Sequence, residues 1–238
     1  RILEKLGLKN NAEITRYAGA KSGAQARVAQ RLDPDRPVEL STQTAIARFG
    51  LPAEFPDAAR LEAQGWGEEV DPEEAARRVD LRPLPLVTID GEDARDFDDA
   101  VFAEPHQDGF RLIVAIADVS YYVRPGGALD DEAVKRGTSV YFPTRVLPML
   151  PTALSNHLCS LEPDVERLCM VADLQLTAHG ALESWRFYPA VMRSAACLTY
   201  DEAFAILFRR DAALRAARDG ALVERLEPLL LAAAPLPS

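Results

Sequence analysis

The feature that most constrains this chain is a run of carboxylates set between two apolar stretches. The segment from Asp90 to Asp99 holds six acidic residues in ten positions. Residues 84–89 before it and 99–103 at its end have the apolar, β-branched character of strands. The fold must therefore hold mutually repelling charges beside a hydrophobic sheet, where like-charge repulsion is costly.

A bound divalent cation would remove that repulsion and reverse the local pKa preferences. The candidate ligands are all oxygen atoms, which favours Mg²⁺, with Mn²⁺ as a second choice, over zinc. The calcium-loop spacing is not met, because the glycine follows the first aspartate directly, at Gly91. The plainer interpretations are a solvated acidic loop and a calcium-stabilised structural domain.

A hairpin argument adds Asp118 to the candidate site. If the turn after the second strand centres near Gln107, Asp98 faces Ile116 and Asp96 faces Asp118. Asp118 ends an otherwise apolar strand, so we expect it at the same edge of the sheet as the acidic run. There it would be an accessory carboxylate that supports the metal ligands without binding the metal itself. The alternative is a strand-end aspartate that caps a turn.

Composition limits the class of protein. The chain is 48% hydrophobic and 27% charged, with a formal net charge of −10, which argues against a generic basic nucleic-acid binder. Three cysteines without close pairing fit a reducing cytoplasm. No stretch approaches the roughly 20 apolar residues of a membrane helix. Gly126-Gly127 follows a proline and indicates a turn rather than a phosphate loop, so no nucleotide cofactor is expected.

Local patterns predict strands in the middle of the chain and helices toward both ends. Helices are expected over 9–32, 56–64 and 129–136. Two further helices are expected from a cap at Ser41 to Phe49, with Gly50 beyond the end, and from Asp71 to near Val79. A capping box at Thr199 opens a helix toward Arg210, and the helical pattern continues to Ala234. Strands are expected over 84–89, 99–103, 110–117 (buried on both faces), 138–142, 168–177 and 182–192, with a proline-rich loop over 143–151. This is an α+β fold, a mixed or antiparallel sheet packed with helices and preceded by a short, mainly helical N-terminal segment.

Four ordered blocks of the sequence, 86–101, 114–123, 136–143 and 147–161, resemble the ribonuclease II / ribonuclease R family of RNB-domain exoribonucleases. The resemblance runs from about Val79 to Tyr200. It implies Mg²⁺-dependent, processive hydrolysis of single-stranded RNA from the 3′ end to nucleoside 5′-monophosphates.

The resemblance also assigns the site residues. The four aspartates of the family fall on Asp90, Asp96, Asp98 and Asp99. We expect Asp90, Asp98 and Asp99 as direct metal ligands and Asp96 as a ligand or orienter, in a site with two cations about 3.5–4 Å apart. The tyrosine of the family that packs on the 3′-terminal nucleotide falls on Tyr141.

The family's downstream arginine and glutamate have no matching motifs before Ser238. We therefore interpret the chain as a piece of a longer protein. Residues 1–50 would be an N-terminal helical segment or the remnant of an RNA-binding module, 51–80 a helical lead-in, and 81–238 the N-terminal part of the RNB domain. The missing motifs favour an alternative, a catalytically silent RNA-binding or scaffold protein, which the intact four-aspartate pattern opposes.

Overall fold

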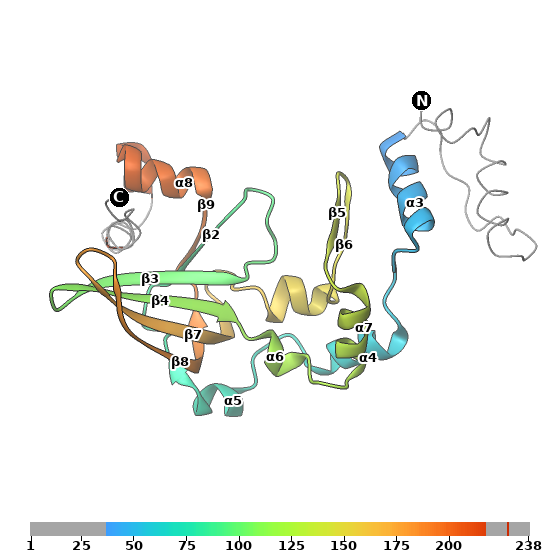
Figure 1. Ribbon diagram of the computed structural model, residues 1–238, viewed down its shortest axis with the longest axis horizontal. Coiled ribbons are helices and arrows are strands. Elements are labelled where there is room, and N and C mark those ends of the chain that lie inside the picture. Colours follow the sequence, from blue (N-terminus) through green and yellow to red (C-terminus); the bar gives the residue numbers. More distant parts are fainter. Residues whose placement is uncertain (1–36, 218–227, 229–238) are drawn as a thin grey trace, which may run out of the picture.

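The computed structural model describes residues 37–217 and residue 228. Its centre is a seven-stranded mixed sheet with the strand order β1-β8-β7-β4-β3-β2-β9, and helices lie on its faces and beyond one end (Figure 1). The strands of this sheet are β1 (Val79–Asp80), β2 (Val87–Asp90), β3 (Asp99–His106), β4 (Gly109–Ala117), β7 (Glu166–Thr177), β8 (Leu182–Arg193) and β9 (Ala196–Thr199). A separate two-stranded hairpin consists of β5 (Val140–Phe142) and β6 (Arg145–Leu147).

The helical elements of the described residues occupy the N-terminal part, the connections and the C-terminal part. They are α3 (Pro37–Phe49), α4 (Asp57–Gly65), α5 (Pro72–Arg77), α6 (Val119–Tyr122), α7 (Ala128–Arg136), the π-helical turn η1 (Leu154–Leu158), α8 (Tyr200–Phe204), the π-helical turn η2 (Ala205–Arg209) and α9 (Ala212–Ala217). A mixed sheet packed with helices, after a helical N-terminal segment, confirms the predicted fold class.

Two long antiparallel hairpins form the body of the sheet. β3 pairs with β4, β4 with β7, and β7 with β8, all antiparallel. The two edge strands are parallel to their neighbours: β1 runs beside β8, and β9 runs beside β2. The pairing of β2 with β9 joins residues more than a hundred positions apart in the sequence, such as Thr88 and Cys197.

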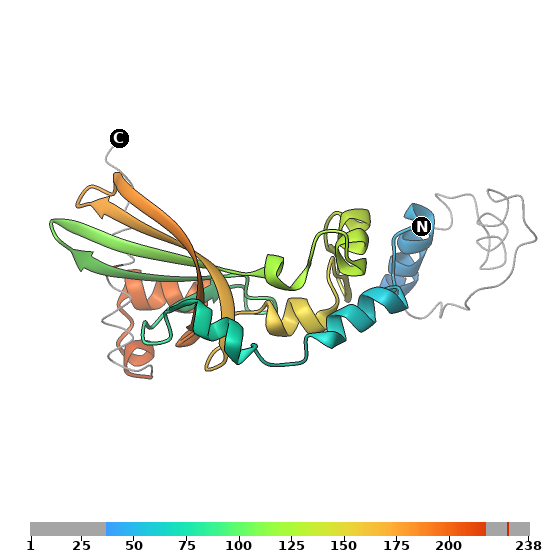
Figure 2. The same ribbon diagram turned by 90° about the horizontal axis from the view of Figure 1, so that it is seen from below.

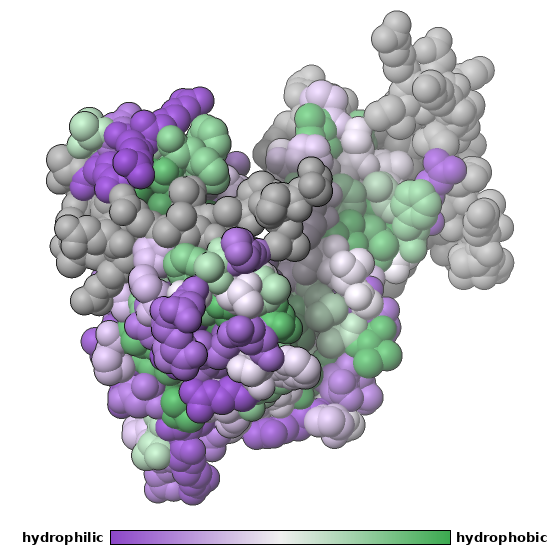
Figure 3. All heavy atoms as spheres, turned by 60° about the vertical axis from the view of Figure 1, so that its left-hand side comes forward, coloured by the Kyte–Doolittle hydropathy of each residue, from purple (hydrophilic) through white to green (hydrophobic). Residues whose placement is uncertain are grey.

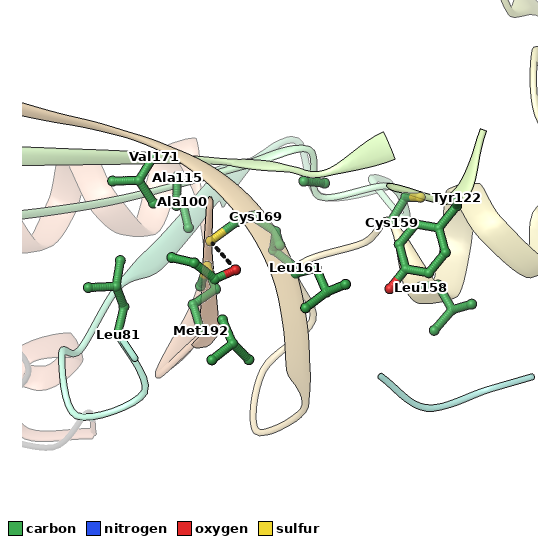
Figure 4. Packing of buried hydrophobic residues seen from close by; sticks show 14 of the residues in the cluster. Leu81, Ala100, Ala115, Tyr122, Leu158, Cys159, Leu161, Cys169, Val171 and Met192 are labelled. Carbon is green, nitrogen blue, oxygen red and sulfur yellow. Dashed lines mark hydrogen bonds between the residues drawn. The ribbon is translucent and has the colours of Figure 1, made fainter. Parts of the chain in front are cut away.

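The sheet has a hydrophobic cluster on each face. One face packs Leu86, Ile113 and Leu168 against η1 and the segments around α6 and α7. Figure 4 shows part of this cluster, in which the Cys169 thiol donates to the carbonyl oxygen of Ala190 at 3.6 Å. The other face packs Val87 and residues of β3 and β9 against α8, η2 and α9. Burying these apolar side chains is the main favourable term in folding.

The helical lead-in, residues 51–80, runs from the region of α7 toward the sheet, which it joins at β1. α4 packs against α7, and Trp66 after α4 forms an aromatic cluster with Tyr121 and Tyr122, with ring centroids 5.1–5.5 Å apart. Figure 2 shows α4 and α5 running along one side of the molecule. These contacts attach the lead-in to the connection that follows β4.

Several predicted helices differ from those observed at their ends. The helix expected to begin after Ser41 begins at Pro37, and the Ser41 hydroxyl donates to the Pro37 carbonyl within it, so the prediction of Ser41 as a cap is wrong. Gly50 follows the helix with φ +62°, as a glycine after a helix end should. α5 ends at Arg77 because Val79 and Asp80 pair with β8 instead. The helix expected over 9–32 lies outside the described residues. The helical stretch expected on to Ala234 is described as far as residue 217, where α9 (Ala212–Ala217) is helical, and at residue 228.

The short edge strands β1 and β9 were not among the predicted strands, and three further features needed correction. The proline-rich segment 143–151 contains β6, which is short and pairs with β5. β4 is not buried on both faces throughout, because Ile116 remains 47% exposed. The turn between β3 and β4 has two residues, Gln107 and Asp108, so His106 pairs with Gly109.

Candidate active site

The acidic run forms a loop at one edge of the sheet. Asp90 is the last residue of β2 and Asp99 the first of β3, and residues 91–98 connect them (Figure 1). Because β2 and β3 are antiparallel, the two aspartates lie at the same end of neighbouring strands. We call residues 90–99 the aspartate loop.

Core contacts fix the end of this loop. The Phe97 ring packs against the hydrophobic cluster, and the Leu161 N–H donates to the Phe97 carbonyl at 2.8 Å. The Ala117 N–H donates to the Asp98 carbonyl at 2.9 Å. The register here is shifted by one residue from the prediction: Asp99, not Asp98, faces Ile116, and Asp96 does not face Asp118. The two-residue turn causes the shift.

The carboxylates of the loop influence one another. Burial raises the pKa of Asp90, and the charges of Asp99 and Asp96 raise it further. Burial also raises the pKa of Asp98, and the charges of Asp96, Asp90 and Asp99 raise it further. The structure thus brings the four predicted aspartates into one electrostatic cluster, in which the neighbouring negative charges disfavour the ionised forms of Asp90 and Asp98.

The donor atoms fit a hard cation in their chemistry. Oδ2 of Asp90 is buried and has no hydrogen-bond partner within the described part of the chain, and a buried carboxylate oxygen of this kind needs a proton or a cation. All four side chains offer oxygen, the ligand that Mg²⁺ and Mn²⁺ prefer. Among residues 37–217 and 228, however, no three His, Cys, Asp or Glu side chains are arranged closely enough to hold a metal ion as they stand.

Tyr141 lies beside the aspartate loop. It is in β5, and its hydroxyl donates to Oδ2 of Asp96 across 3.4 Å. The residue is 67% exposed, so most of its surface is open to solvent. The fold therefore places an open aromatic ring next to the carboxylates.

Asp118 lies in a different environment. It is the N-cap of α6, where it accepts from the Tyr121 N–H and the Ser120 hydroxyl, and it forms a 2.7 Å ion pair with Arg78. Both side chains of that pair are about 5% exposed. These contacts confirm the alternative interpretation, in which Asp118 caps a turn at the end of its strand. Its role as an accessory carboxylate stays a prediction.

Four arginines within the span of the resemblance, Arg136, Arg145, Arg167 and Arg193, are candidates for RNA contact, and each has a protein partner. Arg136 is buried between Glu132 and the Phe55 ring, and Arg167 is buried against the carbonyl of Ser160. Arg193 pairs with Glu166, and Arg145 lies 3.7 Å from Glu54. Their structural roles account for their positions.

A cavity of about 390 Å³ lies at the other end of the long strands, away from the aspartate loop. It is lined by residues of the β3–β4 and β7–β8 turns, including His106 and His179. These turns lie toward the viewer in Figure 3, where the near end of the sheet is mainly hydrophilic. The cavity contains none of the predicted site residues. No described helix is both long and apolar enough to cross a membrane.

Comparison with known proteins identifies the family. The RNB domain model matches residues 78–235. Ribonuclease R of Vibrio parahaemolyticus is 53% identical over 219 residues, which cover 92% of this chain and 25% of that protein. Ribonuclease R of Acidithiobacillus ferrooxidans is 49% identical over 217 residues, covering 91% of this chain and 49% of that protein.

The solved structures agree with this assignment. Mycoplasma genitalium RNase R in complex with ribose methylated single-stranded RNA superposes with a TM-score of 0.72 at 29% identity, covering 82% of this chain and 30% of that one. The chain thus spans between a quarter and a half of the length of the curated relatives named above. By its aspartate loop, its mixed sheet and the match over residues 78–235, the chain belongs to the RNB domain family.

Proposed function

We propose that the chain is part of a cytoplasmic, divalent-metal-dependent exoribonuclease. It would hydrolyse single-stranded RNA processively from the 3′ end and release nucleoside 5′-monophosphates. The observation that carries the proposal is the gathering of Asp90, Asp96, Asp98 and Asp99 at one sheet edge, inside the RNB match. Both curated relatives described above carry the name Ribonuclease R.

The four aspartates would hold the metal, with Asp90, Asp98 and Asp99 as direct ligands and Asp96 as a ligand or orienter. Mg²⁺ is the first choice and Mn²⁺ the second, because the donors are all oxygen. When bound, two such cations supply the positive charge that activates a water molecule and stabilises the departing 3′ oxygen. Oδ2 of Asp90 is buried and has no hydrogen-bond partner among residues 37–217 and 228, which supports its place in this set.

Tyr141 would bind the 3′-terminal nucleotide by stacking on its base. The exposed ring of Tyr141 and the adjacent Asp96 support this, because a base on the ring would place its nucleotide's phosphate near the carboxylates. Stacking on an aromatic side chain is worth about 1–3 kcal/mol per base and tolerates any base.

The division of the chain belongs to the same proposal. Residues 81–238 would be the N-terminal part of the RNB domain and 51–80 its helical lead-in. Residues 1–50 would be a helical segment or the remnant of an RNA-binding module. Since these relatives are two to four times longer than the matched part, the remaining catalytic groups would come from other segments of the full-length protein.

The deciding experiment incubates the full-length protein with uniformly labelled single-stranded RNA and Mg²⁺. We expect mononucleotide products, and we expect Asp98→Asn to bind the RNA nearly as well while losing most cleavage. Glu92→Gln, which removes another exposed carboxylate of the same loop, should cleave as the parent protein does. Near-parental cleavage by Asp98→Asn would contradict the assigned role.

A catalytically silent RNA-binding or scaffold protein is the second candidate. It is favoured by the finding that no three acidic side chains of the described residues are arranged to hold an ion. The same incubation separates the two, since a silent protein binds the RNA and releases no mononucleotides with either Mg²⁺ or Mn²⁺.

A further inference from the structure

A single buried hydroxyl is hydrogen-bonded to the main chain on both sides of Asp96. Oγ of Ser160 accepts from the Phe97 N–H at 3.1 Å and donates to the Arg95 carbonyl at 3.3 Å. A serine hydroxyl has one proton and two lone pairs, so it satisfies a donor and an acceptor together. Ser160 is fully buried, so these bonds are shielded from water.

Ser160 is itself held by the fold. Nε of Arg167 donates to the Ser160 carbonyl at 2.9 Å, and the Arg167 side chain is only 7% exposed. The next residue, Leu161, is fully buried and donates its N–H to the Phe97 carbonyl. The hydroxyl therefore has a fixed position relative to the core.

The geometry of the aspartate loop makes this position important. Phe97 packs against the core, and Asp96 and Asp98 flank it in the sequence. The charge of Asp96 raises the pKa of Asp98, so the bonds of Ser160 to the main chain on both sides of Asp96 act on a segment whose two carboxylates influence each other. Apart from these bonds to Ser160, the described residues 91–97 have a local hydrogen bond among themselves, from the Ala94 N–H to the Gly91 carbonyl.

We propose that Ser160 is a positioning residue that sets the direction of the Asp96 and Asp98 carboxylates toward the metal. The inference rests on the proposed function, because it assumes that these aspartates hold a divalent cation. Groups that orient metal ligands through hydrogen bonds typically change metal affinity about 10–100-fold when they are removed.

The test compares Ser160→Ala with Ser194→Ala in the full-length protein. Ser194 is also buried, and its hydroxyl donates to the Ala196 carbonyl at 3.0 Å, away from the aspartate loop. Binding of Mn²⁺ is measured by electron paramagnetic resonance, and exchange of the amide hydrogens of residues 91–98 by mass spectrometry without metal.

We expect Ser160→Ala to bind Mn²⁺ about 10–100-fold more weakly than the parent. The loop amides should exchange about tenfold faster, as one lost hydrogen bond of roughly 1.4 kcal/mol would produce. Ser194→Ala should leave both quantities unchanged. Equal Mn²⁺ affinity in the two variants would overturn the proposal.

Ser160→Cys provides a second variant if the alanine variant does not fold. A thiol fills the same space but is a weak donor and acceptor, so it should fold and still lose Mn²⁺ affinity. Parental Mn²⁺ affinity in this variant would also overturn the proposal. Failure of the proposed function has a different signature: the unmodified protein would bind no Mn²⁺ and release no mononucleotides.

Discussion

The Tyr141 hydroxyl lies 3.4 Å from Oδ2 of Asp96, and this bond joins the β5–β6 hairpin to the aspartate loop. Partial burial raises the pKa of Tyr141, and the charge of Asp96 raises it further, so the phenol remains a neutral donor at physiological pH. The short hairpin has little core of its own, and this contact places its exposed ring beside the carboxylates.

The Tyr141 ring and its hydroxyl can be tested separately. Tyr141→Ala removes base stacking, worth about 1–3 kcal/mol, so the shortest RNA left at the end of digestion should become longer. Tyr141→Phe keeps the ring and loses only the bond to Asp96, so the shortest product should not change. Denaturing gels of 5′-labelled RNA measure both. An unchanged shortest product in the alanine variant would contradict the stacking role.

The aspartate loop should reduce the stability of the metal-free protein at neutral pH. The folded state raises the pKa of Asp90 and Asp98 above the ordinary value of 3.8, chiefly by burial. The folded state therefore takes up protons at a higher pH than the unfolded chain does. The destabilisation is fully present above the raised values and is relieved as pH falls through them toward 3.8.

Asp90→Asn should accordingly raise the melting temperature in EDTA at about pH 7, by ~2–4 °C for each kcal/mol gained. The gain should be smaller at a second, lower pH nearer 3.8, because the raised pKa lets Asp90 of the parent take up its proton as pH falls. Differential scanning calorimetry measures this, with Glu92→Gln as the exposed control in the same loop. An Asp90→Asn variant that melts below the parent at both values would contradict the prediction.

The ion pair between Arg78 and Asp118 should be important for stability. Removing one partner of a buried pair typically costs about 3–5 kcal/mol, because the other charge is left buried without compensation. Arg78→Met should therefore lower the urea midpoint strongly. Arg82→Met, which removes an exposed arginine paired with Asp80 and Glu166, should lower the midpoint only slightly, because water screens an exposed ion pair. Equal urea midpoints for the two variants would show that the buried ion pair contributes no more to stability than the exposed one.

Two glycines offer a matched test of the sheet. A Cβ added at Gly109 would lie 1.9 Å from the carbonyl oxygen of Leu176 on β7, so Gly109→Ala must displace one of the two strands. We expect a loss of about 1–3 kcal/mol in unfolding free energy. A Cβ at Gly91 has nothing within 4 Å, so Gly91→Ala should leave the denaturation midpoint nearly unchanged.

The sequence predicted the fold class and the long strands because their apolar patterns are strong and local. The capping box at Thr199 and Glu202 and the glycine after α7, Gly137 with φ +73°, also matched their signals. Strand ends were less predictable, because a shift of one residue depends on the length of a turn. Asp118 illustrates this, since the observed register pairs Asp99 with Ile116, so that Asp96 does not face Asp118, and the Asp118 carboxylate forms an ion pair with Arg78.

The hydrogen bonds that hold the aspartate loop in place could not be predicted from local sequence patterns. Ser160 follows Phe97 by more than sixty positions, and only the folded chain brings its hydroxyl to the main chain around Asp96. The block that contains Ser160 was visible as part of the resemblance, but a serine between apolar residues has no distinctive signal of its own. The partners of the four candidate arginines were hidden for the same reason.

The parallel pairing of β2 with β9 affects how the protein is made. Asp90 ends a strand whose outer neighbour arrives only with residues 196–199, and closing so long a loop is slow. During synthesis, a ribosome must translate the whole intervening stretch before β2 gains that neighbour. A nascent chain therefore cannot complete the edge that carries the acidic side chains until Thr199 has emerged from the ribosome.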